Sequence, residues 1–446
     1  MIKYKILLSK KGVLQHFFCF QHIFLNFSGV LLIVNKINNW KKNIILFLTS
    51  QNISLFGSML VQYAITWYIT LKTQSGIMMT VSIICGFLPM FFLSPFAGVW
   101  ADRYNRKLLI VLSDSMIACA TLILAILFFL GFDSVWMLFV ASAIRATGAG
   151  IQTPAVNSFI PQFVPQQNLT KVNATNSTIQ SLVTLAAPML SGILLSLATI
   201  EIIFFIDVIT AAIAVMILLL NVHVPAHAKA LKKQEESYFK DMIEGIKYIK
   251  NHDYVKIFFL FNAFFFILLA PAAFLTPLQV ARTFGDDVWR LTAIEVVFSL
   301  GMIIGGIIMA NWGGLKNRVY TMILANMING VLICTLGLTP FFWGYLVLMT
   351  LIGLVVPSFN TPAMVMLQQK VEEEFLGRVF GVMGMISSIM MPLGMLVFGP
   401  IADYVRIEWL LIGTGLLMVV QSVFMLKSKV LIKAGMLAIK AEKYKA

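Results

Sequence analysis

Four charged side chains interrupt the long apolar runs of this 446-residue chain: Asp114, Arg145, Asp207 and Glu295. If those runs cross a membrane, each charge costs about 2.5 kcal/mol or more in hydrocarbon and requires a partner or a function. An arginine deep in a span calls for a carboxylate or an anionic substrate, whereas a buried carboxylate can bind and release protons. We therefore take Asp207, Glu295 and Asp114 as candidate proton carriers and Arg145 as a candidate substrate contact. For all four, a structural pair that holds helices together is the alternative.

The elements that must position these residues are long apolar segments. Residues of the set AVILMFWYC make up 59% of the chain and charged residues 12%, against roughly 25% charged residues in soluble proteins. A helix needs about 20 apolar residues to cross the hydrocarbon core, and the alternating strands of a β-barrel are not seen. The sequence predicts an all-α polytopic membrane protein with twelve spans, near residues 44–71, 76–100, 108–132, 135–160, 172–198, 202–222, 257–281, 291–312, 319–339, 342–367, 378–402 and 407–426.

The distribution of lysine and arginine predicts the orientation. With both termini in the cytoplasm, 28 of the 33 basic residues fall in cytoplasmic segments, four fall at outer loops, and Arg145 lies inside a span. The formal net charge of +14 is then explained by a lipid surface, and no nucleic acid is expected as a partner. We expect a multi-pass protein of the cell membrane with both termini in the cytoplasm.

A polar connection at residues 223–256 divides the chain into two six-helix bundles, 38–222 and 257–427, and a basic cytoplasmic tail follows at 428–446. Apolar residues recur at helical spacing from 238 to 249, which predicts a short amphipathic helix at the cytoplasmic interface, with a regulatory site as the alternative. The bundles share Thr-Pro-Ala at 153–155 and 361–363, as transporters built from repeats do. Prolines expected to act as helix hinges are Pro154, Pro188, Pro362 and Pro392.

Residues 1–37 do not fit this scheme. The segment 12–34 is apolar enough to span, but it contains His16 and His22, and basic residues flank both of its ends. No small-x-small cleavage site follows it, as a signal peptide would require. We expect an N-terminal extension that stems from a misassigned start, with an extra amphipathic or thirteenth helix as the alternative.

The loop after the second span carries the pattern Gly-x-x-x-Asp-Arg-x-x-Arg-Lys, from Gly98 to Lys107. Asp102 can accept hydrogen bonds from the N-terminus of an adjacent helix, and Arg106 four residues later can pair with it. This loop resembles the signature between helices two and three of the major facilitator superfamily, from which Trp100 and Asn105 depart. The resemblance implies that Asp102 caps the start of helix eleven when the cytoplasmic side closes. The conformational gate would then comprise Gly98, Asp102, Arg103, Arg106, Lys107, Gly377 and Arg378.

Other motifs resemble the drug:proton antiporters of this superfamily. Arg145 is similar to the arginine of the antiporter signature in helix four, and Ala187-Pro188-Met-Leu-Ser191-Gly192 is similar to the helix-five motif G-P-x-x-G-G. The runs that resemble its macrolide-efflux branch are Gly86-Phe-Leu-Pro89, Ile144-Arg145, Thr153-Pro-Ala155, Ile206-Asp-Val208, Leu376-Gly-Arg-Val-Phe380 and Met391-Pro-Leu-Gly394.

This resemblance implies an exporter of lipophilic drugs, macrolide-type antibiotics first among them, in exchange for protons. It implies no cofactor and no ATPase partner. An exporter of a siderophore or a lysolipid transporter of the same fold is the alternative, and export rather than import rests on the resemblance alone.

The resemblance also implies that helices one, four, seven and ten line a central cavity. The polar residues then within reach of substrate are Gln51, Gln62, Arg145, Asn262, Asn360 and Gln368. The chain has 36 phenylalanines and 25 methionines, whose adaptable surfaces suit varied apolar ligands.

Other function classes are disfavoured. An ATP-driven pump would need a Gly-x-x-x-x-Gly-Lys-Ser/Thr loop, which the sequence lacks. The four cysteines stand singly in apolar stretches, so no metal site is expected. A membrane-embedded enzyme would need a catalytic cluster, yet the histidines lie outside the predicted spans, at positions 16, 22, 223, 227 and 252. We therefore expect no enzyme, and nothing argues for the filter of a channel.

Overall fold

The computed structural model describes residues 39–222 and 247–443. This part of the chain is helical, and twelve of its helices are long and apolar enough to cross a membrane. The predicted N-terminal extension, 1–37, and most of the predicted amphipathic helix in the connection lie outside the described residues. The all-α fold class with twelve spans is confirmed.

The N-terminal half contains six long helices. They are α2 (Asn39–Thr73), α3 (Gly76–Arg103), α4 (Arg106–Phe129), α5 (Val135–Phe163), α6 (Leu169–Leu197), which follows a short 3-10 turn at Gln166–Asn168, and α7 (Ile200–Asn221). Polar caps set the start of two of them: Ser75 accepts a bond from the Met78 amide at α3, and Asn105 accepts from the first amides of α4. Asn105, a departure from the family signature, is thus a helix cap here.

The C-terminal half contains the other spans and one further helix. They are α9 (Asp253–Phe274), α10 (Thr276–Thr283), α11 (Val288–Trp312), α12 (Arg318–Leu338), α13 (Phe342–Lys370), α14 (Glu373–Ile401), α15 (Ile407–Lys427) and α16 (Lys429–Lys443). The predicted span at 257–281 is interrupted between α9 and α10, at Leu275. Pro277 lacks an amide hydrogen and its ring crowds the preceding turn, which accounts for the break.

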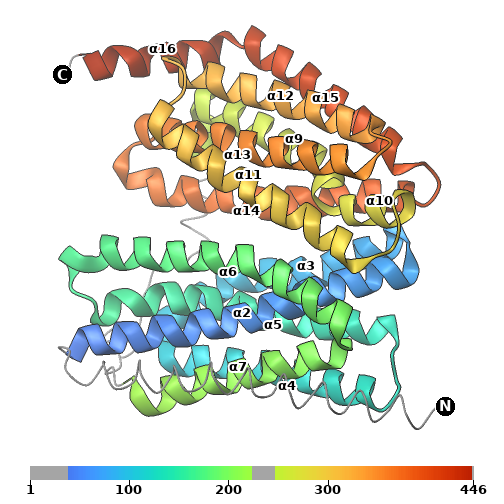
Figure 1. Cartoon of the computed structure of the whole chain (residues 1–446). Helices are drawn as coiled ribbons and strands as arrows, with labels where there is room; N and C mark the ends of the chain where they lie inside the picture. Colours follow the sequence, from blue (N-terminus) through green and yellow to red (C-terminus); the bar gives the residue numbers. More distant parts are fainter. Residues whose placement is uncertain (1–38, 223–246, 444–446) are drawn as a thin grey trace.

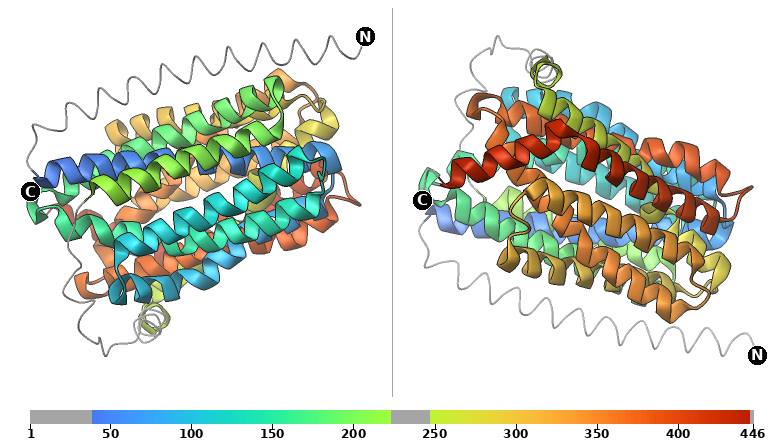
Figure 2. Two further views of the ribbon diagram at one scale, coloured as in Figure 1. Left: turned by 90° about the horizontal axis from the view of Figure 1, so that it is seen from below. Right: turned by 90° about the horizontal axis from the view of Figure 1, so that it is seen from above.

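The two halves lie against each other along four helices. Figure 1 shows the C-terminal half above the N-terminal half, and α3 and α6 of the lower half contact α14 and α11 of the upper half. Figure 2 shows the outer face of each half, where the long helices run side by side. Large apolar side chains are exposed on the outside of the bundle, among them Phe129, Trp343 and Phe424, as expected of surfaces that face lipid.

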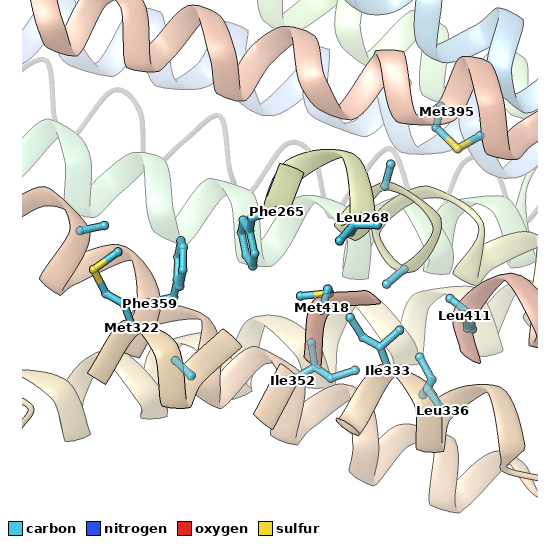
Figure 3. Packing of buried hydrophobic residues seen from close by; sticks show 14 of the residues in the cluster. Phe265, Leu268, Met322, Ile333, Leu336, Ile352, Phe359, Met395, Leu411 and Met418 are labelled. Carbon is cyan, nitrogen blue, oxygen red and sulfur yellow. The ribbon is translucent and has the colours of Figure 1, made fainter. Parts of the chain in front are cut away.

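A continuous apolar core fills the C-terminal half (Figure 3). Phe265 of α9 stacks on Phe359 of α13 with ring centroids 4.3 Å apart, and methionines such as Met418 and Met395 belong to the same cluster. Two smaller clusters serve the N-terminal half. Each half therefore has packed apolar clusters, and Trp67, Met79 and Ile83 of the N-terminal half join the larger one.

The basic tail contains a helix that the sequence reading did not predict. Leu431 and Ala434 of α16 are buried against the C-terminal half, and Asn317 donates a hydrogen bond to the carbonyl of Ile432 over 3.3 Å. A Cβ on Gly435 would lie 1.8 Å from Asn317 Oδ1, so only glycine permits this approach. The apolar residues of α16 recur every three to four positions, and the many lysines around them obscured this pattern in the sequence.

The bundle has two unlike ends. We call the end where α3 passes into α4 the Arg106 end, and the opposite end, where α14 passes into α15, the Asp403 end; they lie left and right in Figure 1. At the Asp403 end, a Cβ on Gly76 of α3 would lie 2.1 Å from the carbonyl oxygen of Gly399 of α14. At the Arg106 end, a Cβ on Gly98, Gly381 or Gly384 would meet no atom of the described residues within 4 Å. The halves are therefore packed together at the Asp403 end and apart at the Arg106 end.

Candidate functional site

Arg145 and Asp207 form an ion pair inside the N-terminal half. Arg145 of α5 has 7% of its side chain exposed, and Asp207 of α7 is fully buried. Arg145 donates to Asp207 and to the hydroxyl of Thr121, and its second terminal nitrogen donates to the carbonyl of Ser58 over 3.0 Å. Asp207 also accepts from the Thr121 and Ser58 hydroxyls, at 2.9 and 3.3 Å. Each charge therefore has several partners, which come from α2, α4, α5 and α7.

The close approach of α2 to this pair depends on a glycine. A Cβ on Gly57 would lie 2.0 Å from Thr210 Oγ1 and 3.0 Å from Asp207 Oδ1. Thr210 in turn bonds its own helix, at the carbonyl of Asp207. Gly57 thus lets α2 lie directly over the ion pair and exclude solvent from it.

Asp114 of α4 is also buried, with 1% of the residue exposed. Its Oδ1 accepts hydrogen bonds from Ser54 Oγ at 2.8 Å and from Gln152 Nε2 at 2.7 Å. Its Oδ2 has no hydrogen-bond partner, and neither has the nearby Nε2 of Gln51. Asp114 has no cation within salt-bridge distance in the described part of the chain, unlike Asp207.

Glu295 of α11 lies where the two halves meet. One turn before it, Thr292 lies so close to Gly192 of α6 that a Cβ there would be 1.7 Å from its hydroxyl. Glu295 is near enough to Tyr63 of α2 to interact with it electrostatically. Its carboxylate makes no hydrogen bond or ion pair with any residue in the ranges 39–222 and 247–443. A carboxylate in this position needs a proton, a cation or water.

A cavity of about 250 Å³ lies in the N-terminal half beside these groups. Its walls come from α2, α3, α4, α5 and α6, and amide side chains dominate its polar lining: Gln51, Asn52, Gln62, Gln152, Asn157, Asn176 and Gln180. Arg145, Ser54 and Ser58 also reach it, with apolar residues such as Phe47 and Met59 between them. The described wall therefore offers many hydrogen-bonding groups. It carries little net charge, because Asp207 neutralises Arg145.

A polar stripe on α6 extends from this cavity. Asn173, Ser177, Gln180 and Thr184 recur at spacings of three and four residues, so they share one face of the helix, and all four are exposed. A membrane-spanning helix does not present such a stripe to lipid, because unpaired polar groups are costly in hydrocarbon. We therefore expect this stripe to face away from lipid, and Gln180 is the member of it that lines the cavity.

The structure brings together only part of the predicted cavity set. Gln51, Gln62 and Arg145 line the cavity, whereas Asn262, Asn360 and Gln368 of the C-terminal half do not. Asn262 is buried and donates to the sulfur of Met383 over 3.0 Å. Asn360 and Gln368 are exposed on α13.

The sequence reading missed several lining residues, Gln152, Asn157, Asn176 and Gln180 among them. Two signals for them were present in the sequence. Asn176 and Gln180 are four residues apart on a predicted span, and Gln152 and Asn157 lie on the same predicted span as Arg145. Asn176 and Gln180 lie on the fifth span, outside the four helices that the family resemblance assigns to the cavity, whereas Gln152 and Asn157 lie on the fourth span, within that set.

The predicted gate loop is held by contacts within the N-terminal half. Arg106 donates to the carbonyls of Ala101 and Ser158, at 2.8 and 2.7 Å, and Lys107 donates to those of Leu219 and Val222. Gly98 has open space beside it, and Arg103 is exposed. The structure does not describe the surroundings of the Asp102 side chain or of Gly377. The predicted cap of Asp102 on helix eleven therefore stays a prediction.

The start of α14 is instead in contact with the end of the connection. Tyr248 stacks on Phe375 with ring centroids 4.6 Å apart and donates a hydrogen bond to Glu372. That bond holds the pKa of the Glu372 carboxyl below its usual value. Arg378 lies over the ring of Phe375, 5.4 Å from its centroid. The connection is thereby anchored to the helix that faces α3.

All four predicted hinge prolines lie inside continuous helices. Pro154 is in α5, Pro188 in α6, Pro362 in α13 and Pro392 in α14. Each removes one backbone hydrogen bond from its helix, so these are the places where bending is least costly. Their role as hinges stays a prediction.

Residues 44–395 match the profile of the Major Facilitator Superfamily. The chain belongs to this superfamily. It is 29% identical over 383 residues to Macrolide efflux protein A of Streptococcus pyogenes, covering 85% of this chain and 94% of that protein, which supports a place in the macrolide-efflux branch. It is 22% identical to the Staphyloferrin A transporter of Staphylococcus aureus, over 80% of this chain and 89% of that one.

The solved structures agree on the fold. A bacterial homologue of the lysosomal transporter Spinster, described as inward-facing and unoccupied, superposes with a TM-score of 0.61 at 13% identity, covering 88% of this chain and 96% of that one. The relatives and the fold are those of transporters that need no ATPase partner. The protein is thus a multi-pass transporter of the cell membrane.

Proposed function

We propose that this major facilitator exports macrolide-type lipophilic compounds from the cytoplasm in exchange for protons. The observation that carries the substrate class is the similarity to Macrolide efflux protein A, which spans 94% of that relative. The transport cycle would alternate between two arrangements of the halves, with the cavity open at one end and then at the other.

The Arg106 end is proposed to face the cytoplasm. The Asp403 end carries few basic residues, namely Lys72, Arg282, Arg290 and Arg406, whereas most lysines and arginines belong to segments at the other end. Lys and Arg accumulate on the cytoplasmic side of membrane proteins. The structure then corresponds to a state that is open inward and closed outward, in which substrate enters from the cytoplasm.

The chemistry of the cavity supports a ligand without strong negative charge. Arg145 is the cation in the described lining, and Asp207 neutralises it. A chelator with several carboxylates would find no uncompensated positive charge there and would lose its hydration without replacement. Seven amides can both donate and accept, which suits the hydroxyl, ether and carbonyl groups of a large polyoxygenated lipophile. The cavity therefore favours the macrolide class over a carboxylate-bearing siderophore.

Among the three candidate carboxylates, Glu295 is the best placed proton carrier. Asp207 is held by an ion pair and two hydroxyls, and its charge is needed to balance Arg145. Glu295 has no such partner in the described chain and lies between the halves, so gain or loss of a proton there changes the charge at the surface that must open. Asp114 is the second candidate, because Ser54 and Gln152 connect it to the cavity wall.

The test is efflux of a radiolabelled macrolide from a drug-sensitive bacterium that expresses the full chain. We expect the wild-type protein to lower cellular macrolide and an uncoupler to abolish this effect. Glu295→Gln is expected to abolish the energised component while Glu201→Gln, an acidic position at the start of α7, retains it. Wild-type protein that reaches the membrane without exporting any macrolide would contradict the substrate class, and full activity of Glu295→Gln would exclude this residue as the carrier.

A further inference from the structure

Helices α3 and α14 end in the same sequence pattern. Both helix ends carry Gly-x-x-Ala-Asp, at Gly98–Asp102 in the last turns of α3 and at Gly399–Asp403, which begins in α14 and continues two residues past its end. The two helices lie side by side in opposite directions, so one pattern is at the Arg106 end and the other at the Asp403 end. The second pattern belongs to no part of the predicted gate.

Asp403 caps α3 across the boundary between the halves. Its Oδ1 accepts from the backbone amide of Gly76 at 2.6 Å, and its Oδ2 accepts from the amide of Ile77 at 3.0 Å and the hydroxyl of Ser75 at 2.8 Å. The first amides of a helix lack partners within the helix and carry partial positive charge. A carboxylate is therefore a strong ligand for this terminus, and here it comes from the other half of the protein.

Arg282 of α10 strengthens the same contact. It donates to Asp403 over 3.0 Å and to the carbonyl of Ala402 over 2.6 Å, and its Nε donates to the carbonyl of Gln74 over 3.1 Å. Gln74 has a φ of 46°, a left-handed conformation that few non-glycine residues adopt. The C-terminal half thus binds the turn between α2 and α3 in two ways: Arg282 donates to the carbonyl of Gln74, and Asp403 accepts from the amides of Gly76 and Ile77.

Close helix packing accompanies these bonds. A Cβ on Gly399 would lie 1.7 Å from the hydroxyl of Thr80, and Thr80 donates to the carbonyl of Met395 over 3.1 Å. At the other end of the same helix pair, an added Cβ on Gly98 or Gly381 has no neighbour within 4 Å among the residues that the structure describes. Of the two Gly-x-x-Ala-Asp termini, the one at the Asp403 end is engaged and the glycine of the other is free of contact.

The charge of Asp403 is stable at neutral pH. Burial by itself tends to raise the pKa of this carboxyl, but the amides of Ile77 and Gly76, the Ser75 hydroxyl and Arg282 together outweigh that effect and hold the pKa below its usual value. Asp403 therefore acts as a fixed anion, distinct from a proton carrier such as Glu295.

We propose that Asp403, positioned by Arg282, is the latch that keeps the Asp403 end closed by capping α3 from the opposite half. The cap is made when this end is shut and must break for it to open, so the strength of the cap sets the balance between the two states. This proposal rests on alternating access between the halves, and neither on the macrolide nor on the proton.

The test measures the two ends separately by spin labels on the full chain in lipid nanodiscs without substrate. The native cysteines are replaced. One label pair, at Thr199 and Phe341, reports the Asp403 end; a second pair, at Tyr104 and Lys316, reports the Arg106 end. All four positions are exposed, and each pair joins the two halves.

Asp403→Ala is expected to shift the balance toward opening of the Asp403 end by about 5- to 30-fold, the range for a carboxylate at a partly buried helix terminus. The distance at that end should lengthen while the distance at the Arg106 end shortens. Asp403→Asn, which keeps an acceptor without the charge, should give a smaller shift. Asp133→Asn is the matched control, because this acid at the same end bonds Lys72 and Tyr68 of its own half.

Distributions for Asp403→Ala that equal those of the wild type at both ends would overturn the proposal. If Asp403→Ala fails to reach the membrane, Arg282→Gln and Ser75→Ala each remove part of the same contact and must shift the balance in the same direction. A shift in distances without macrolide efflux would leave the latch standing and count against the proposed substrate alone.

Discussion

Replacing Asp207 by asparagine tests whether the ion pair with Arg145 is structural. Asp207 is fully buried and Arg145 is 7% exposed, so water cannot compensate the charge that remains. In Asp207→Asn, Arg145 retains the carbonyl of Ser58 and the hydroxyl of Thr121 as neutral acceptors but loses its counter-ion. An unpaired charge is left at the centre of the N-terminal half.

Removing one partner of a buried pair costs about 3–5 kcal/mol, whereas replacing both partners by neutral groups of similar volume is often close to neutral. We therefore expect Asp207→Asn to be strongly destabilised. The double variant Arg145→Gln/Asp207→Asn should recover most of the loss, to within about 1–2 kcal/mol of the wild type, because two amides can bond each other. The recovery, and not the loss alone, identifies the charge as the cause.

The assay is thermal unfolding of the purified full chain in detergent, followed by the fraction that remains monodisperse on size-exclusion chromatography. The expected order of stability is wild type, then the double variant, then Asp207→Asn. A single variant as stable as the wild type but inactive in transport would refute the reasoning, and would point to Asp207 as the proton carrier.

Four further predictions follow from the geometry. In liposomes, Glu295→Gln should bind macrolide but no longer couple its movement to a pH gradient, because its side chain cannot change charge; coupling that persists would contradict this. Gly399→Val should open the Asp403 end in spin-label measurements, since its Cβ alone would be 1.7 Å from a neighbouring hydroxyl, whereas Gly98→Val should leave that end as it is. Because its pKa is lowered, Asp403 contributes to closure above its usual titration range and loses that contribution only as pH falls through the lowered pKa, so the difference in distance between the wild type and Asp403→Ala at this end should be the same from about pH 8 to about pH 5. Gln180→Leu should raise KM for macrolide by about 2- to 10-fold with little change in kcat, as expected for one lost hydrogen bond to the ligand; an unchanged KM would remove this residue from the site.

Most of the fold was predictable because hydrophobicity over a span is a strong signal. The predicted spans at 135–160 and 407–426 agree with α5 and α15 to within a few residues at each end. The break between α9 and α10 was not predicted, since a proline can bend a helix or interrupt it and hydropathy does not distinguish the two. Helix α16 was not predicted because its lysines outweigh a narrow apolar face.

The charged part of the site was predictable because a charge that interrupts a span stands out, and the family resemblance added Gln51 and Gln62 of the cavity wall. A carboxylate partner was expected for Arg145, but its identity depends on how four helices pack, and Asp207 is 62 residues away in sequence. The other amides of the cavity wall, such as Asn176 and Gln180, carry no charge, and their spacing on a predicted span is a weaker signal than a charge. The latch at Asp403 involves a loop residue and backbone amides from the other half, 326 or more residues apart, which a single sequence cannot place together.

The most direct test of proton-coupled export uses the purified protein in liposomes with a radiolabelled macrolide. A pH gradient is imposed across the membrane. Protons that leave the acidic compartment through the protein should drive the macrolide into that compartment against its own gradient. A protonophore that collapses the pH gradient should stop this accumulation. Accumulation that requires Glu295 and disappears with the gradient is the predicted result; macrolide movement that is the same with and without the gradient would contradict the account.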